Sequence, residues 1–597
     1  MNTNFDGFVV ARGMDGSTNP IILQSGYYAH AVNRAFRGYK NRTRPPFKEI
    51  SLTFDSQSTE SAFRNGAVQG AIGFRAVIGN PKAKIVVAVG GRLIAIEITG
   101  STGIVKTIRE GLEKSFMKAW FVQVEDRIYM QDGANRPLGW DGVKEVYEIA
   151  DDGESMPVGT AMAYAQGRLA VTTADNKIII SDHIYGSSLA DTRGTEKFTE
   201  FQQYNDIGAF VAPSNLGPIT SIAPIPQPGT VNAQGPLMVM CSNGAIAIDT
   251  SRSRDTWLTG NVQTTIMLGR GGCGHSAIIP VNDDVWFITS DGIISSYRFE
   301  QSFRGDSAGD VSMSTEVDKY MSLCSKGALQ FASMVKCDNR ILATTAIQIS
   351  QSTEGGIHRY ALGMVALDLY QGSNKTPTAG LTWDGLWTGI QPTEMVNLYV
   401  DGHQRTFAFS FKDGVNSLYE ICSGQGDDYS VEHGASKIES QFDMGALFAQ
   451  REFNQMPVNK RAKAVSFTAS EVFGKCSASA KIRPVFYPKW AEAMSEKTFG
   501  IEPDGFGLGF VNFGLQYAEV QGESIKPTES EEDTYRLMSV ASGFMLRMEC
   551  KGSFAVEMVQ LEAQVIADTK NAADGDKDTR NRTIRDAGDN YFTYKIP

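Results

Sequence analysis

The sequence has few of the residues on which small disulfide-bonded or metal-binding domains depend. Its 597 residues contain only seven cysteines, scattered along the chain without a Cys-x-x-Cys pair. An odd and dispersed set of thiols argues against both a disulfide framework and a zinc ribbon, and it indicates assembly in a reducing compartment. The cysteines are Cys241, Cys273, Cys324, Cys337, Cys422, Cys476 and Cys550.

Histidine and long apolar runs are also scarce. The six histidines stand alone, without an HxH or HExxH pattern, and no G-x-x-x-x-G-K-[ST] phosphate loop occurs. The most apolar stretch, residues 85–98, is interrupted by Gly90, Gly91 and Arg92, and a membrane-spanning helix needs about 18 apolar residues. The first residues lack the basic and apolar regions of a secretory signal. We therefore expect no membrane insertion by this chain.

The net charge of -11 bears on nucleic-acid binding. Proteins that grip a phosphate backbone carry clustered Lys and Arg, so this charge argues against broad, salt-sensitive binding of DNA. A channel wall that repels phosphate would still let DNA pass. Ordinary solubility explains the same charge equally simply.

Short runs of alternating apolar residues, bounded by Gly, Asn and Asp, predict an all-β protein. Three of these runs have the form of β-hairpins, with turns around Asn243-Gly244, Asp291-Gly292 and Asp413-Gly414. Asn or Asp followed by Gly favours the positive φ angles that two-residue hairpin turns require.

A loose repeat runs through the same region, in which a turn and usually an Arg precede an apolar strand. Its copies are GGRLIAIEI at 90, EDRIYMQD at 125, QGRLAVTT at 166 and DNRILATTA at 338, with NDDVWFIT at 282 as a degenerate copy. Small sheets repeated at this spacing predict a β-propeller over residues 76–435, with about six blades and with five or seven as close alternatives. The GH and WD signature of WD40 repeats is missing.

The two ends of the chain differ in texture from this region. Long β-rich runs predict a further antiparallel, sandwich-like β domain over residues 436–566, and residues 567–597 predict a charged flexible arm. Residues 1–75 predict an N-terminal extended segment that contributes to a platform or adaptor contact. Its basic patch could hold phosphate or an acidic neighbour, or be a solvated loop. The patch consists of Arg34, Arg37, Lys40, Arg42 and Arg44.

Only isolated candidates for chemistry occur. Ser307 lies in a G-x-S-x-G string without the strand-turn-helix setting of a nucleophile elbow. Cys273 and His275 share a glycine-rich run, GRGGCGHSA, but no carboxylate stands nearby in sequence to orient them. Carboxylates cluster at Asp151, Asp152 and Glu154, at Asp283 and Asp284, and at Asp574, Asp576 and Asp578, where turn or incomplete calcium-loop contexts favour solvated turns. We therefore assign no catalytic residue, no cofactor and no metal ligand.

The order of segments resembles the tail nozzle and packaged-DNA stabilisation proteins of short-tailed bacteriophages. The similarity lies in KIIISDHIYGSS (177–188), GPITSIAPIP (217–226), LMVMCSNGAIAIDT (237–250) and GRGGCGHSAIIPVNDDVWFITSDGIISSYR (269–298), and in the run IESQFDMGALFAQREFNQMPVNKRAKAVSF (438–467). The charged end of this chain is a departure from that family.

The resemblance implies a structural virion protein and not an enzyme. It implies a ring, a hexamer, in the virion tail, assembled in the bacterial cytoplasm and stacked on an adaptor or portal-proximal ring beside tail fibres. Through this ring DNA would be retained and then ejected without sequence-specific binding. Two alternatives stay open, namely a receptor-binding or baseplate protein and a propeller enzyme that acts on glycans.

Overall fold

The computed structural model describes most of the chain. The described residues are 11–24, 26–75, 82–184, 193–198, 209–230, 233–257, 260, 262–303, 312–351, 356–369, 381–421, 424–446, 460–485, 495–501, 517–520, 540–541, 543–565 and 591–596. They divide into two compact units. The propeller unit comprises Phe47–Met364 and Gly389–Cys422, and the ribbon unit comprises Met1–Pro46, Val365–Thr388 and Ser423–Pro597.

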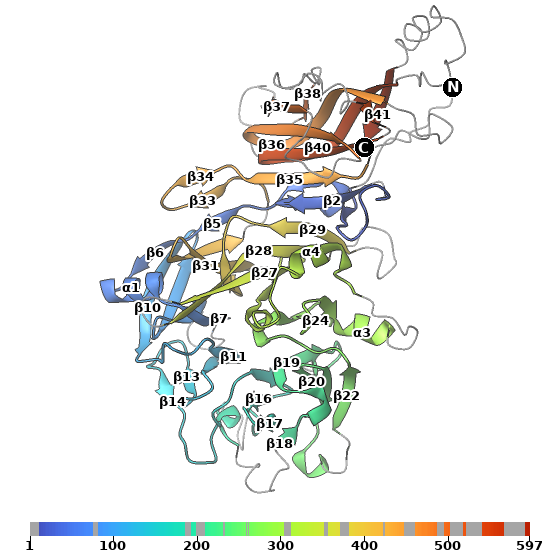
Figure 1. Ribbon diagram of the computed structural model, residues 1–597. Coiled ribbons are helices and arrows are strands. Elements are labelled where there is room, and N and C mark those ends of the chain that lie inside the picture. Colours follow the sequence, from blue (N-terminus) through green and yellow to red (C-terminus); the bar gives the residue numbers. More distant parts are fainter. Residues whose placement is uncertain are drawn as a thin grey trace, which may run out of the picture. The chain divides into compact units, whose positions relative to one another are not determined.

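The fold is nearly all-β, and the predicted β-propeller is confirmed. Six small sheets are arranged as blades, and some of their strands are labelled in Figure 1. The first three, in spatial order, are β6 (Ser51–Phe54), β10 (Thr102–Glu110), β9 (Arg92–Thr99), β8 (Lys84–Val89) and β7 (Val68–Phe74); β11 (Trp120–Val124), β12 (Arg127–Gln131), β13 (Leu138–Trp140) and β14 (Tyr147–Glu148); and β15 (Met162–Ala165), β16 (Arg168–Thr172), β17 (Lys177–Ile180) and β18 (Ala209–Val211).

The remaining three sheets complete the set. They are β19 (Ile219–Pro226), β20 (Gln234–Cys241), β21 (Gly244–Ile248) and β22 (Gln263–Leu268); β23 (Ile278–Val281), β24 (Asp284–Ile288) and β25 (Ile294–Ser296); and β30 (Pro392–Val400), β31 (His403–Lys412), β32 (Val415–Ile421) and β5 (Phe47–Glu49). Strands β26 (Met334–Cys337) and β27 (Arg340–Gln351), with the first part of β28 (Ile357–Asp368), lie between the fifth and sixth sheets. The innermost strands of the six sheets are β7, β11, β15, β19, β23 and β30. Strand β26 lies between β23 and β30 and contacts both, so seven strands follow one another around the ring.

Helices are few in the described part of the chain. They are α1 (Gln57–Asn65), α3 (Tyr297–Phe303) and α4 (Asp318–Met321), with several short 3-10 turns. Ser56 caps α1, because its hydroxyl accepts a hydrogen bond from the backbone N–H of Thr59 at 3.1 Å. None of the described helices has the length and apolar character that a membrane crossing requires.

The sequence repeat marks hairpin turns at which the chain enters a second or third strand. At Gln166-Gly167, both residues have positive φ angles, 51° and 75°, and Arg168 opens β16. The same geometry occurs at Asp338-Asn339, with φ angles of 45° and 58°. The three predicted hairpins are present as β20–β21, β24–β25 and β31–β32. The turn at Asp413-Gly414 has φ angles of 53° and 83°, as a type I′ turn requires.

The ring closes through a short N-terminal stretch. Strand β5 pairs with β32 of the last sheet, with Glu49 opposite Tyr419, and β6 pairs with β10 of the first sheet, with Ser51 opposite Thr102. One hydrophobic core joins the same two sheets and includes Ile85, Val87, Phe407, Phe409 and Leu418. The propeller unit therefore begins at Phe47, upstream of the predicted start at residue 76, because its first strands pair with β32 of the last blade and β10 of the first.

The ribbon unit is built on one antiparallel-rich sheet. Its central strands follow the order β29 (Thr382–Trp387), β2 (Tyr27–Val32), β35 (Glu439–Met444), β40 (Phe544–Val565), β36 (Lys460–Pro484) and β37 (Ser495–Ile501). Shorter strands are β1 (Gly13–Met14), β3 (Arg34–Ala35), β4 (Asn41–Thr43), β33 (Asp428–Ser430), β34 (Gly434–Ser436), β38 (Tyr517–Val520), β39 (Val540–Ala541) and β41 (Tyr591–Ile596). The predicted C-terminal β domain thus shares its sheet with N-terminal strands, and its described long strands lie in a single sheet.

Closure of the ring predicts that even a small side chain at Gly73, a residue of β7, strongly lowers the stability of the protein. A Cβ atom added to Gly73 would lie 1.8 Å from the backbone oxygen of Asn397 on β30, so the first and last inner strands could not approach each other. We expect Gly73→Ala to lower the free energy of unfolding by about 1–3 kcal/mol or more, as overpacking does. Urea denaturation followed by fluorescence measures this. Gly327→Ala is the matched control, because a Cβ there meets nothing within 4 Å; equal effects would contradict the closure argument.

Candidate functional site

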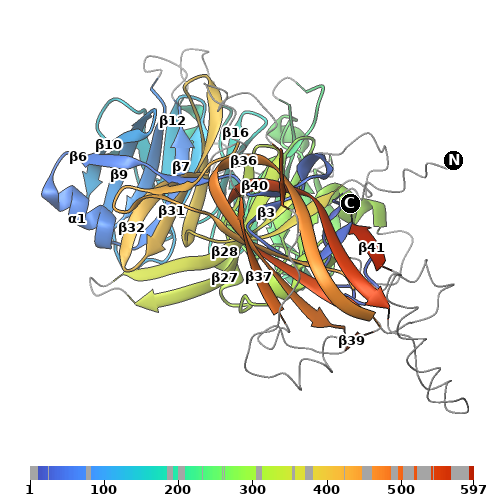
Figure 2. The ribbon, with the colours of Figure 1, turned by 90° about the horizontal axis from the view of Figure 1, so that it is seen from above.

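The most unusual element of the structure is a pair of long strands in the ribbon unit. Strands β36 and β40 have 25 and 22 residues and pair from Lys460 opposite Val565 to Pro484 opposite Phe544. Figure 2 shows them side by side. Strands in globular proteins usually have about 5–6 residues, so this ribbon is several times longer than a domain core requires, on the order of 80 Å at about 3.3 Å per residue.

Short strands cover the outer edges of this ribbon only in part, among the described residues. Along β40 they are β35, β4 and β41, and along β36 they are β37, β38 and β39. Strand β37 pairs with seven residues of β36, β38 with four and β39 with two. The edge positions of β36 between these strands have no partner strand among the described residues, and such edges can pair with another strand.

The ribbon bends near its middle, at a bulge in β36. Seven residue steps on β36, from Ser470 to Ser477, face four on β40, from Ala555 to Lys551. Glu471 and Gly474 have positive φ angles of 54° and 67°, and Gly552 opposite them has 108°. Bulges of this kind bend the bulged strand and re-aim its side chains.

Two residues of the N-terminal basic patch hold the bulge. Lys40 Nζ and Arg42 Nη2 donate to Glu471 Oε1 at 3.0 and 2.9 Å, and Gln425 Nε2 donates to Oε2 at 2.8 Å. The Glu471 side chain is only 15% exposed. A negative charge shared between two cations in this setting fixes the backbone around it.

The rest of the patch is also paired inside the ribbon unit. Arg34 is fully buried, and its Nε donates to Asn41 Oδ1 at 2.6 Å. Arg37 pairs with Asp368 and Arg44 with Asp428, both at 2.7 Å. The prediction that this patch binds an acidic neighbour is therefore correct. The acidic residues belong to the same chain. A solvated loop was the wrong interpretation, because all five side chains are paired with acids or core groups, although Lys40 and Arg42 keep 31% and 36% exposure.

Cys273 and His275 lie in a buried polar cluster of the propeller unit, just before the inner strand β23. Lys118 precedes β11, Ser333 precedes β26, Glu394 lies early on β30 and Arg359 lies on β28. Arg359 Nη2 lies 3.3 Å from Glu394 Oε2 and donates to the backbone oxygen of Gln69 at 2.6 Å. Ser333 Oγ donates to Glu394 Oε1 at 3.2 Å.

The cations of this cluster hold a short turn. Lys118 Nζ donates to the backbone oxygen of Gln330, and the guanidinium of Arg359 and the ammonium of Lys118 lie 5.4 and 5.1 Å from the centre of the Phe331 ring. Gly274 packs against this turn so closely that an added Cβ would lie 2.4 Å from the backbone oxygen of Gln330. Both cations thus anchor the 3-10 turn Leu329–Phe331 over the glycine-rich run.

The protonation states in the cluster are those of unreactive groups. Burial raises the pKa of the Cys273 thiol to about 12 and lowers the pKa of His275 to about 4. Burial also raises the pKa of Glu394, against which the charge of Arg359 acts. A cysteine nucleophile needs a thiolate, which a neighbouring imidazolium or other cation stabilises. Here the thiol is protonated and the imidazole neutral at pH 7, so the arrangement does not activate Cys273.

The other candidates from the sequence form turns or lie outside the described residues. Asp152 accepts from the backbone N–H of Glu154 at 3.0 Å, and Asp284 accepts from the N–H of Arg298 at 3.0 Å. Within the described ranges, no group of three or more His, Cys, Asp or Glu is placed to hold a metal ion. Ser307, Cys422, Asp574, Asp576 and Asp578 lie outside the described residues, as does most of the predicted arm 567–597. Sequence inspection missed Lys118, Arg359, Glu394 and Glu471, which no local motif marks.

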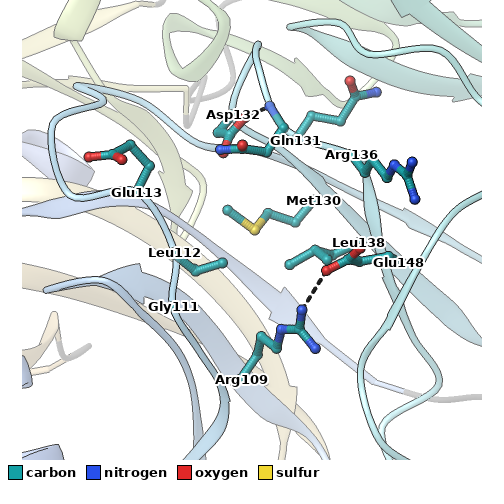
Figure 3. A pocket seen from close by; sticks show the side chains of 11 residues that line it. Arg109, Gly111, Leu112, Glu113, Met130, Gln131, Asp132, Arg136, Leu138 and Glu148 are labelled. Carbon is teal, nitrogen blue, oxygen red and sulfur yellow. Dashed lines mark hydrogen bonds and ion pairs between the residues drawn. The ribbon is translucent and has the colours of Figure 1, made fainter. Parts of the chain in front are cut away.

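A surface cavity of about 380 Å³ lies between the first two sheets of the propeller unit. In Figure 3, Met130 and Leu138 lie between Asp132 on one side and the Arg109–Glu148 pair on the other. The candidate carboxylates Asp151, Asp152 and Glu154 follow closely in sequence after the lining residue Glu148 but do not line this cavity.

The comparisons with known proteins do not extend these findings. No protein-family model and no curated protein matches the chain. Similar solved structures include "Crystal Structure of Mitotic Checkpoint Complex", at 10% identity and TM-score 0.35, covering 60% of this chain and 90% of that one. "YCF48 bound to D1 peptide" has 10% identity and TM-score 0.34, covering 64% and 96%. "Crystal structure of BBS1N in complex with ARL6DN, soaked with mercury" has 14% identity and TM-score 0.26, covering 43% and 69%. TM-scores this low support no argument about function.

The partly buried amine of Lys118 predicts a specific pH dependence of stability. Burial, with the charge of Arg359 as a second cause, lowers the pKa of Lys118 from 10.5 to about 8. Between these two values the unfolded chain binds the proton and the folded chain does not, so stability rises with pH in this window. We expect wild type to gain on the order of 1–3 kcal/mol relative to Lys118→Met between pH 8 and 10.5. Urea denaturation of both proteins across this range measures the difference, and a constant difference would contradict burial of a charged amine.

The ion pairs of Glu471 predict that its negative charge keeps the bend of the ribbon rigid. We expect Glu471→Gln to speed amide hydrogen exchange in residues 469–479 and 551–556 about tenfold, because hydrogen bonds to charged groups contribute about 1.5–3 kcal/mol. Glu549→Gln is the matched control, since Glu549 pairs with Lys481 at 2.9 Å on the same ribbon away from the bulge. Equal effects of the two variants on the bend would argue against the clamp.

Proposed function

We propose that this protein is a structural component of a virion tail, a nozzle or tube ring through which phage DNA is retained and then ejected. The observation that carries the proposal is the long β36–β40 ribbon, whose outer edges are covered only in part by the described strands. Partly covered strand edges are templates for pairing with another chain. Association of copies around an axis would satisfy these edges and enclose a channel.

Charge distribution supports the same proposal. The chain carries a net charge of -11, and its N-terminal basic patch is engaged with acids of the ribbon unit. Arginine and lysine side chains that are paired in this way do not offer free cations to a phosphate backbone. A channel wall with few free cations lets DNA slide past without holding it.

The reactive groups support a structural role over an enzymatic one. The Cys273–His275 run lies in a cluster whose ionic groups pair with one another, and its thiol is protonated at neutral pH. A propeller enzyme would instead need groups with pKa values matched to proton transfer at an open mouth. The bacteriophage nozzle resemblance of the sequence points in the same direction as this chemistry.

Partners follow from the ring proposal. A ring of identical copies, a hexamer in the resembled family, needs two different complementary surfaces on each copy. Stacking against an adaptor or portal-proximal ring and contact with tail fibres would complete its place in the virion tail. These partners come from the resemblance, and the ribbon supplies only the pairing edges between copies.

Electron microscopy of the purified full-length chain tests the proposal. We expect negatively stained particles to be rings with an open centre, and mass photometry to give a mass that is a multiple of 65.0 kDa. Dilution should shift the distribution towards single chains, because the ring depends on association between copies. A monomer at all concentrations that releases sugars from glycans would support the enzyme alternative. A monomer that binds host cells would support the receptor-binding alternative.

A further inference from the structure

The cavity between the first and second sheets offers a binding site that the proposed conduit does not use. It lies beside β10 on one side and beside β12, β13 and β14 on the other, with a volume of about 380 Å³. Figure 3 shows the lining side chains; Arg109 comes from the end of β10, Leu112 and Glu113 follow that strand, and the others come from the strands and turns of the second sheet. Concave sites with a few polar groups over an apolar floor are the usual form of small-molecule sites.

The rim carries hydrogen-bonding groups that keep free capacity. Arg109 Nη2 pairs with Glu148 Oε1, and these side chains are 40% and 46% exposed. Arg136 is 56% exposed, and its contact with Asp151 is long, at 3.9 Å. Asp132 differs, since it accepts from the backbone N–H groups of Ala134 and Asn135 at 2.9 and 2.7 Å. Asp132 therefore shapes the turn, while Arg109, Glu148 and Arg136 can bind a ligand.

The floor of the cavity is apolar and contains no aromatic ring. Met130 and Leu138 are buried, at 4% and 7% exposure, and Leu112 is partly buried beside them. Such a floor can cover the C–H face of a small ligand by dispersion contacts. It does not provide a ring on which a base or another planar group could stack.

The charges of the lining residues further limit the kinds of ligand that this cavity can bind. Two arginines and three carboxylates line the cavity, so a strongly charged ligand of either sign meets groups of its own sign. A hydroxyl group both donates and accepts, and so it can bridge a guanidinium and a carboxylate at once. We propose that this cavity binds a neutral, hydroxyl-rich ligand of the size of a hexose or disaccharide. Its hydroxyls lie on Arg109, Glu148 and Arg136, and its C–H face lies on Met130 and Leu138.

Saturation-transfer difference NMR and calorimetric titration of the full-length protein test this site. The probes are glucose, galactose, mannose and maltose, each titrated to high millimolar concentration. We expect at least one of them to saturate with a Kd of about 1 mM, a typical weak affinity for a small site. Glycerol, which is too small to span the rim and floor, should give no saturable signal.

The double variant Arg109→Ala, Glu148→Ala removes one charge of each sign from the rim and should weaken saccharide binding at least tenfold. The matched control is Lys326→Ala, Asp291→Ala, which removes another exposed pair, 2.8 Å apart, elsewhere in the propeller unit. This control should bind as wild type does. The proposal is overturned if no sugar of the panel binds or if both double variants weaken binding equally. None of these outcomes depends on whether the chain forms a ring.

Discussion

Closure of the sheet ring is the constraint on which the propeller unit depends. No blade can bury both of its faces alone. The ring therefore closes only if the first and last blades are held against each other. The stretch from β5 to β6 solves this by giving one strand to each of these blades, and a shared core of apolar side chains fills the space between them. The absence of a side chain at Gly73 is part of the same solution, because β7 and β30 meet there through their backbones.

Paired charge plays the corresponding role in the ribbon unit. Arg34, Arg44 and Glu471 are removed from water, and each is matched by hydrogen-bonding partners that compensate for its lost hydration. Breaking one partner of such a set costs more than a surface ion pair contributes. The basic character of residues 34–44 therefore belongs to the architecture of the unit, and the bend of the long ribbon is set by contacts with it.

The sequence predicted local features well and distant ones poorly. Turn residues such as Asp413-Gly414 and the repeat before Arg168 and Arg340 were found because positive φ angles restrict the residue types in a turn. The propeller followed from their spacing. The return of β5 and β6 to the ring was missed, because strand pairing across several hundred residues leaves no local pattern. The same holds for Lys118, Glu394 and Arg359, which come from separate strands and become a cluster only in the folded chain.

The shared sheet of the ribbon unit has a consequence for the order of events during synthesis. Ala31 on β2 pairs with Phe442 on β35, so these partners leave the ribosome 411 residues apart. Contacts of such high sequence separation form slowly, and the waiting strands expose edges that can aggregate. Strand β2 therefore lacks this partner strand until nearly three quarters of the chain has been made. Chaperone demand should accordingly be greatest for nascent chains that stop just short of β35.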